Sequence, residues 1–328
     1  MTSGADWLSR LMRLLTVSGS LDHRCFLGAP WRIDYPAPLP GGIPFHIVLG
    51  GSVVLLHSEG GASQKLVAGD IVLITDGAEH ALHDGSEAPP SPIRKRPSPN
   101  VTIAENDGTG ERLDILCGSF QLSPAHEQLV RGYLPRRIVI SAAENSAATA
   151  GSGTTALVAG LVSLMRSEAG MGNVGGMAML DALSTALFAL TLRLASEAGQ
   201  ATEGLLALAG NPRLAPALTA MFNDPARSWT LPDLSRLCNM SRATFIRHFQ
   251  DKLGHSPAVL LADIRMTTAA NALETSDNST GAIAELVGYQ SEAAFQRAFK
   301  QKKGVTPSQW RKRLRAGNAG GLSILAEG

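Results

Sequence analysis

The sequence has little cysteine and almost no net charge. Its three cysteines, Cys25, Cys117 and Cys238, are far apart and no pair has the CxxC spacing, so we expect neither a disulfide framework nor a zinc module. The 29 basic and 28 acidic residues leave a formal net charge of +1, which gives no general indication of a nucleic-acid partner. Any binding to nucleic acid must therefore come from local basic patches.

The sequence also shows no secretory signal and no stretch that we would assign to a membrane. The amphipathic N-terminal segment, residues 6–15, lacks a long apolar region and a cleavage site. The 328 residues, 44% of them hydrophobic, suffice for two domains with substantial cores. We therefore expect a cytoplasmic protein whose cysteines are buried, reduced thiols.

Between Gly19 and about Cys117, short apolar runs alternate with turn residues, which predicts a small antiparallel barrel or sandwich. Within this region, the segment from Gly69 to His80 resembles the second cupin motif, with Thr75 in place of the motif's proline. Around His46, however, the chain has one histidine where catalytic cupins have two. His46 and His80 alone are too few ligands for a metal, so we expect no metal. Both histidines are then structural or line the pocket of an organic ligand.

The segment 88–100 contains five prolines, which predicts a loop without regular structure. It also contains the basic triplet Arg94-Lys95-Arg96, which is either a solvated loop tip or a site for an anionic effector. Guanidinium groups hold phosphates bidentately and stack on purines, so a cyclic dinucleotide such as cyclic di-GMP is one candidate. Asp84 and Ser86 make only a loose likeness to the motif of PilZ-type receptors, and a sugar or other metabolite fits equally well.

From Ser123 to Gly210 the composition is that of helices, with long ones predicted at 154–168 and 176–198 and a flexible joint at 199–204. The second long helix has a wide apolar face that needs a partner. That partner is either the helix's own domain or a second copy of the chain, and we favour a homodimer through this helix. Residues 211–222 are predicted to form a further helix, which we assign to the next domain.

The C-terminal region contains one pattern twice, fifty residues apart. Its members are Ser241, Phe245, Phe249, Gly254 and Pro257 in the first copy and Ser291, Phe295, Phe299, Gly304 and Pro307 in the second. In each copy a short helix and a turn precede a serine cap and a second helix, whose aromatic residues face the core at i and i+4. The repeat predicts two helix-turn-helix units, each placing the start of its second helix in the major groove of DNA.

The two predicted recognition helices present different side chains. Arginine can pair with guanine, threonine can contact the thymine methyl group, glutamate can accept from cytosine and glutamine can read adenine, whereas lysines contact phosphate without reading sequence. We predict DNA contacts from Arg242, Ala243, Thr244, Arg247 and Lys252, and from Glu292, Ala293, Gln296, Arg297 and Lys300, with Lys302 and Lys303 as further phosphate contacts. These lysines belong to a basic stretch that runs to Arg315 without an acidic residue.

Residues 229–313 resemble the DNA-binding domain of the AraC family of bacterial regulators. The likeness rests on Trp229-Thr230-Leu231, Met240–Phe245, Arg247-His248-Phe249, Gly254–Pro257, Arg265-Met266, Ile283-Ala284, Val287-Gly288-Tyr289, Ser291–Phe295, Arg297–Lys300 and Gly304–Pro307. The chain departs from the family at Lys303, where an aromatic residue is usual, and at Cys238-Asn239, where Val-Gly is usual. The resemblance implies two recognition helices in successive major grooves, preceded by a cupin-like sensor.

We therefore expect an α+β protein with three parts: a cupin-like antiparallel β-barrel sensor at 1–122, a helical linker and dimerisation region at 123–204, and an all-α domain with two helix-turn-helix units at 205–315. Such a protein is a ligand-responsive transcription regulator without a cofactor, an activator that binds promoter DNA and RNA polymerase. Two other hypotheses are a cupin enzyme fused to a DNA-binding domain and a constitutive architectural binder whose barrel senses nothing.

Overall fold

The computed structural model describes residues 6–57, 63–141, 153–198, 201 and 203–313. Its backbone contacts divide the chain into two compact units. One unit, the sensor unit, is Leu15–Gly210, and the other, the C-terminal unit, combines Met1–Leu14 with Asn211–Gly328. This division differs from the predicted one at both ends of the sensor. The small and polar residues 141–153 predict a loop before the first long helix; this segment lies almost wholly outside the described residues, as does Arg315.

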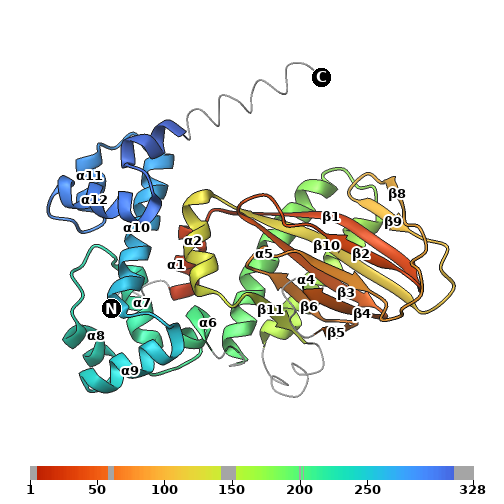
Figure 1. Ribbon diagram of the computed structural model, residues 1–328, viewed down its shortest axis with the longest axis horizontal. Helices are drawn as coiled ribbons and strands as arrows, with labels where there is room; N and C mark the ends of the chain where they lie inside the picture. The colour runs from red at the N-terminus through yellow and green to blue at the C-terminus, as the bar shows by residue number, and fades with distance from the viewer. Residues whose placement is uncertain (1–5, 58–62, 142–152, 199–200, 202, 314–328) are drawn as a thin grey trace. The chain divides into compact units, whose positions relative to one another are not determined.

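The sensor unit is built on two sheets (Figure 1). The larger sheet has the strand order β11 (Arg137–Ile140), β6 (Ile71–Ile74), β3 (Gly42–Gly50), β10 (Arg112–Leu122), β1 (Val17–Gly28), β9 (Thr102–Glu105) and β8 (Arg94–Pro97). The smaller sheet has the order β2 (Arg32–Tyr35), β7 (His80–His83), β4 (Ser52–His57) and β5 (Gln64–Val67). Every pairing is antiparallel except that of β1 with β9. The predicted cupin-like α+β architecture is therefore confirmed.

One hydrophobic core holds the barrel together. Strands of both sheets contribute fully buried side chains to it, among them Leu27, Leu55, Val72, Leu82 and Ile115. In a strand, alternate side chains point to the same face, so one strand can supply the core and its outer surface at once. The cysteines Cys25 and Cys117 lie in this core, as free thiols.

In the described part of the sensor unit, four helices accompany the sheets: α2 (Pro124–Tyr133), α4 (Gly153–Gly170), α5 (Gly176–Glu197) and α6 (Gly204–Ala209). Ser123 caps α2, because its side chain accepts from the Ala125 backbone N–H. Helix α5 lies along β1 (Figure 1), so closely that a Cβ on Gly19 would overlap Ser184. Most of the apolar face on which we based the dimer, including Leu180 and Leu187, is consequently buried within the unit itself.

Helix α5 also corrects our statement about membranes. By length and composition it could cross a membrane, contrary to our expectation that no stretch would do so. Its buried face, however, packs on β1, as the core helix of a globular domain does. Composition alone is therefore weak evidence for a membrane span here.

The C-terminal unit consists of α1 (Trp7–Leu14), α7 (Ala215–Asn223), α8 (Leu231–Leu237), α9 (Arg242–Leu253), α10 (Pro257–Thr275), α11 (Thr280–Leu286) and α12 (Glu292–Lys303). The first helix of the chain packs on α7 and α10. Arg10 donates from Nε to Asn223 Oδ1 over 2.7 Å, and Asn271 Nδ2 donates to the Leu14 carbonyl oxygen over 2.6 Å. Leu8 and Leu11 are buried, so α1 completes the core of a unit that lies some two hundred residues downstream.

Four residues of the proline-rich segment, Arg94–Pro97, form a strand, contrary to our prediction, while the rest of the segment has no helix or strand. Its basic triplet lies in β8, which pairs with β9 at the end of the larger sheet. Among the described residues, strand β8 pairs with one neighbour, β9. Proline has no backbone N–H, and on the unpaired side of an edge strand none is needed, so Pro97 and the prolines beside the strand are tolerated there. The strands β2 and β11 and the helix α6 were also missed, because they are too short to carry a periodic pattern.

Candidate nucleic-acid interface and sensor interior

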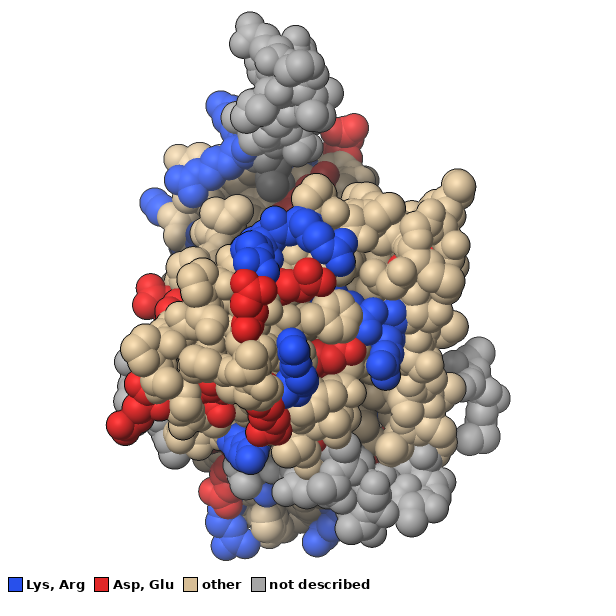
Figure 2. Space-filling model, turned by 90° about the vertical axis from the view of Figure 1, so that its right-hand side faces the viewer, with Lys and Arg blue, Asp and Glu red and all other residues tan. Residues whose placement is uncertain are grey.

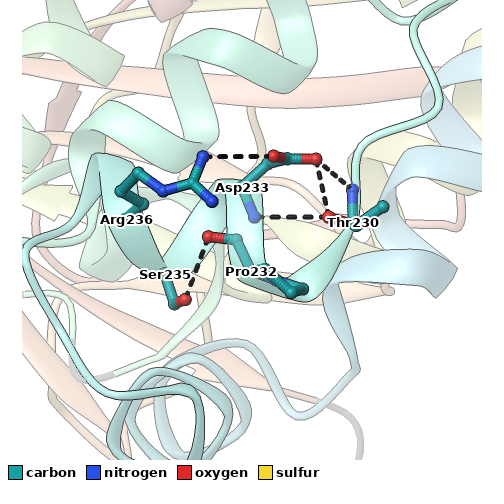
Figure 3. Close-up of polar contacts among 5 residues, drawn as sticks. All are labelled: Thr230, Pro232, Asp233, Ser235 and Arg236. Atoms are coloured by element: carbon teal, nitrogen blue, oxygen red, sulfur yellow. Dashed lines mark hydrogen bonds and ion pairs between the residues drawn. The ribbon is translucent and has the colours of Figure 1, made fainter.

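The first helix-turn-helix unit begins at a capping box on α8 (Figure 3). The Asp233 carboxylate accepts from the backbone N–H and the hydroxyl of Thr230, over 3.2 and 2.6 Å, and the Asp233 N–H donates back to the Thr230 hydroxyl over 3.3 Å. The hydrogen bonds from Thr230 lower the pKa of Asp233. Arg236 pairs with the other carboxylate oxygen at 3.4 Å. These contacts fix where the supporting helix starts.

The turns of the two units have different lengths. Asn239 and Gly288 take the left-handed conformation at equivalent places, with φ of 49° and 80°. Only one residue separates Asn239 from the cap Ser241, whereas two separate Gly288 from the cap Ser291. Equivalent residues of the two units are thus 49 positions apart up to the turn and 50 positions apart after it. Asparagine tolerates this conformation better than most residues, which explains how Asn239 can stand where the family usually has glycine.

The recognition helix of the first unit is α9. Ser241 caps it by accepting from the Thr244 N–H, and Phe245 and Phe249 anchor it in the core. Arg242, Ala243 and Arg247 are exposed, and Thr244 is half-buried with its hydroxyl accepting from Ser241 over 2.9 Å. Four of the predicted contact residues therefore share the outer, N-terminal surface of this helix, whereas the fifth, Lys252, is half-buried in its last turn.

The recognition helix of the second unit is α12, which Ser291 caps in the same way. Glu292, Ala293, Gln296, Arg297 and Lys300 are all exposed on it. The Gln296 amide donates to Glu292 Oε1 over 2.8 Å, so these two side chains act as one hydrogen-bonding pair on the free protein. This surface carries a carboxylate in its first turn, which the surface of α9 does not.

Two of the lysines predicted to contact phosphate lie against helix α10 instead. Lys302 forms an ion pair with Asp263 of α10 at 2.7 Å. Burial lowers the pKa of Lys303 to about 8, with Asp263 and Glu274 acting in the opposite direction. Both lysines therefore hold α12 against α10, while the side chain of Lys300 faces solvent. Sequence spacing could not separate them, because all three fall within one helical turn.

Arg265, for which the sequence predicted no role of its own, connects the two helix-turn-helix units. Arg265, on the shared helix α10, donates from Nε to the carbonyl oxygen of Pro225 over 2.6 Å, and from Nη2 to those of Ala226 and Arg227 over 3.2 and 3.0 Å. Its guanidinium lies 5.9 Å from the ring centre of Tyr289 in the second unit. Burial lowers the pKa of Arg265, yet it remains charged at neutral pH.

A cluster of polar side chains is buried inside the barrel. His46 Nε2 lies 2.8 Å from His80 Nε2, and the Tyr35 ring stacks on that of His80 at 4.9 Å. His80 Nδ1 lies 3.1 Å from the Ala78 carbonyl oxygen, which can only accept, so His80 carries its proton there and accepts from His46 at Nε2. The Tyr35 hydroxyl donates to Cys117 Sγ over 3.3 Å.

Three members of this cluster, Tyr35, His46 and Cys117, are uncharged at neutral pH. Burial lowers the pKa of His46 well below its ordinary value, and the neighbouring His80 lowers it further. The thiol of Cys25 and burial both raise the pKa of Cys117. Across the described residues, no three His, Cys, Asp or Glu side chains are grouped to hold a metal ion. A cavity of about 500 Å³ lies beside the cluster and is lined by Tyr35 and His80 together with Arg32, Asp34, Leu56 and Glu79.

The structure does not bring the predicted ligand residues together. Arg94 pairs with Asp107 at 2.5 Å and Arg96 with Glu105 at 3.2 Å, all on the exposed edge of the larger sheet. On the face drawn in Figure 2, basic side chains similarly lie beside acidic ones. Lys95 is exposed on the same strand. Asp84 and Ser86 form a turn after β7 of the smaller sheet, and His46 and His80 are inside the barrel.

Two helix-turn-helix units on one connecting helix, joined in the chain to a cupin-like barrel, define a class of protein, the DNA-binding transcription regulator. A family model described as cupin matches residues 6–197, and a model of the helix-turn-helix domain matches residues 234–313. The chain belongs to the AraC-family transcription regulators with an N-terminal cupin domain.

The relatives extend over nearly the whole chain. An uncharacterized HTH-type transcriptional regulator of Haemophilus influenzae is 30% identical over 94% of this chain and 98% of its own length. The HTH-type transcriptional regulator MtrA of Neisseria gonorrhoeae is 29% identical, and the RCS-specific HTH-type transcriptional activator RclR of Escherichia coli is 26% identical, over the same shares. All three relatives bear the name of a transcriptional regulator or activator.

Proposed function

We propose that this protein is a ligand-responsive, sequence-specific regulator whose monomer reads an asymmetric DNA site. The observation that supports it most is the unlike surface of the two recognition helices. Helix α9 exposes Arg242 and Arg247, which suit guanine or phosphate, whereas α12 exposes Glu292 beside Arg297. Two such helices on one α10 read two different sequences in successive grooves.

Selection of binding sites from random DNA with the full-length protein tests this proposal. We expect two unlike sequence elements separated by about one helical turn, roughly 10 base pairs. Affinity should fall steeply as salt rises, because the exposed arginines and lysines displace counterions from phosphate. Two identical elements, or no enriched sequence, would contradict the proposal.

We propose that the chain dimerises through the outer surface of α4 and α5. Helix α5 was our first candidate, but its long apolar face is largely buried, and the apolar side chains left exposed are Leu157 and Leu164 on α4 and Met177 and Met179 on α5. The two helices pack against each other, so these side chains lie on one hairpin. A second copy that contributes the same surface would cover them in a symmetric interface.

Sedimentation of the full-length protein tests the dimer. Leu164→Asp should shift the dimer towards monomer, because it places a charge in an apolar contact. The matched control is Leu39→Asp, which changes a residue that is 81% exposed outside the hairpin. If Leu164→Asp leaves the mass unchanged while the wild type is a dimer, the interface lies elsewhere.

A small-molecule effector bound by the cupin domain is the proposed input. The cavity beside His80 has the volume of a ligand site and carries both charges and an aromatic ring, which suits a polar metabolite or sugar. Cyclic di-GMP, the nucleotide suggested by Arg94 and Arg96, must compete with Asp107 and Glu105 for these guanidinium groups. Calorimetry with wild type and with Arg94→Ala compares the two: binding that this change removes would favour the nucleotide.

We propose further that the regulator is an activator, acts in the cytoplasm where chromosomal DNA lies, and contacts RNA polymerase rather than catalysing a reaction. The relative RclR bears the name of an activator, which supports the sign of regulation. Transcription in vitro from a promoter that contains the selected site tests it. Reduced transcript in the presence of the protein would make it a repressor.

A further inference from the structure

A second cavity of the sensor unit lies beneath α4. It has a volume of about 380 Å³, within the usual range of small-molecule sites. Its walls are apolar and come from both sheet and helices, chiefly Leu49, Ile71, Ile140, Val158, Val162 and Leu194. It is distinct from the cavity beside His80, whose lining residues it does not share.

One positive charge stands beside this apolar cavity. The Asp114 carboxylate accepts from Arg24 through two hydrogen bonds, of 3.1 Å from Nε and 3.0 Å from Nη2. Arg166, which lines the cavity, is 3.8 Å from the same carboxylate, and its side chain is 57% exposed. Two guanidinium groups thus share one carboxylate, and the tighter pair is made by Arg24. The charge of Arg166 is left incompletely neutralised and available to an anion.

Helix α4 is only lightly attached where it covers the cavity. Of its 18 residues, only Thr154, Val158, Met165 and Ala169 are buried. Between Val158 and Met165 the inner side of the helix faces the cavity through Ala159, Val162 and Ser163. An apolar molecule placed there would supply contacts that the helix lacks.

We propose that this cavity binds an amphipathic monocarboxylate of medium chain length, with its hydrocarbon chain against Val158, Val162 and Leu194 and its carboxylate on Arg166. The apolar walls select the hydrocarbon, and the incompletely paired guanidinium selects the anionic head. The ligand steadies α4, and α4 carries Leu157 and Leu164 on its outer side. This regulatory consequence rests on the function proposed above, whereas the binding itself does not.

Titration calorimetry of the full-length protein with hexanoate, octanoate and decanoate tests the site. Affinity should rise about fourfold for each methylene that the cavity buries. Arg166→Ala should weaken octanoate binding about tenfold or more, because it removes a charge-assisted hydrogen bond. The matched control is Arg193→Ala, an exposed arginine of α5 that does not line the cavity and should leave affinity unchanged.

A second variant, Val162→Trp, should fill the cavity and abolish binding of every chain length while the protein stays folded by circular dichroism. Octanoate that binds equally to wild type, Arg166→Ala and Val162→Trp would overturn the site, and so would the absence of binding. Operator binding is measured on the same samples with and without octanoate. An operator affinity or dimer mass that octanoate shifts supports the effector role, and unchanged values overturn that role alone. Failure to bind any specific DNA would contradict the proposed function but would leave the calorimetric test of the ligand site unaffected.

Discussion

The first helix of the chain should decide whether the DNA-binding unit is stable. Leu11 lies on α1 and is 1% exposed, in a core that α1 shares with α7 and α10. Leu11→Ala should therefore destabilise that unit by about 3 kcal/mol, near the lower end for buried leucines, because a short surface helix can partly close the cavity. For a domain of this size the change lowers Tm by roughly 10 °C.

Calorimetry and tryptophan fluorescence together report this effect. Three of the four tryptophans, Trp7, Trp229 and Trp310, are in the C-terminal unit, so the fluorescence change on unfolding follows that unit more than the sensor. Specific DNA binding should weaken near the lowered Tm, even though α1 is far from the recognition helices in sequence. The control Leu39→Ala, at an exposed leucine of the sensor, should change neither transition.

A Leu11→Ala variant that lowers only the transition of the sensor unit, or neither transition, would contradict this prediction. Either result would mean that α1 contributes nothing to the core of the C-terminal unit, despite the hydrogen bonds of Arg10 to Asn223 and of Asn271 to Leu14. Removing residues 1–14 offers an independent check. It should lower the same transition by at least as much as the point change.

Three further outcomes follow from the C-terminal unit. Arg247→Ala and Arg297→Ala should each cost about 1–3 kcal/mol in specific DNA binding and relax the sequence preference of a different half of the site, while thermal unfolding is unchanged; equal operator affinity in a shift assay would rule out these groove contacts. Gly288→Ala should destabilise the second turn, because φ is 80° and a Cβ would overlap the Ala226 carbonyl oxygen; a wild-type Tm would contradict this. The pKa of Lys303 is lowered to about 8 in the folded protein. Between pH 8 and about 10.5 this lysine is therefore protonated in the unfolded chain and largely neutral in the folded one. The free energy of unfolding should rise by about 1–3 kcal/mol as the pH increases over that range. Lys303→Met should flatten this rise in urea titrations, and a slope equal to that of the wild type would refute the assignment.

The sequence determined the tandem helix-turn-helix units almost completely. Their helices are set by local signals: serine caps at Ser241 and Ser291, paired phenylalanines at helical spacing, and glycines that end α9 and α12 in the left-handed conformation. These signals act over a few residues, so they can be read without knowing the rest of the fold. The cupin-like class of the barrel followed in the same way, from short alternating runs and the turn before His80.

Tertiary structure alone decided which long-range partners meet. Arg94 and Arg96 read as a free basic patch until strand pairing placed Glu105 and Asp107 beside them. Lys303 read as a phosphate contact until the packing of α12 on α10 buried it. In both cases the partner lies on another element, at a distance in sequence that no local pattern encodes.

The same limit applies to the two amphipathic helices α1 and α5. An amphipathic helix at residues 7–14 is evident from its periodicity, but its periodicity does not say which core it enters. Likewise, the apolar face of α5 was evident, but whether β1 or a second molecule covers it depends on the whole sensor fold. Local sequence therefore determined the helices of the tandem units, because caps and periodicity are short-range, whereas burial and pairing, which decide what each surface meets, came only from the folded chain.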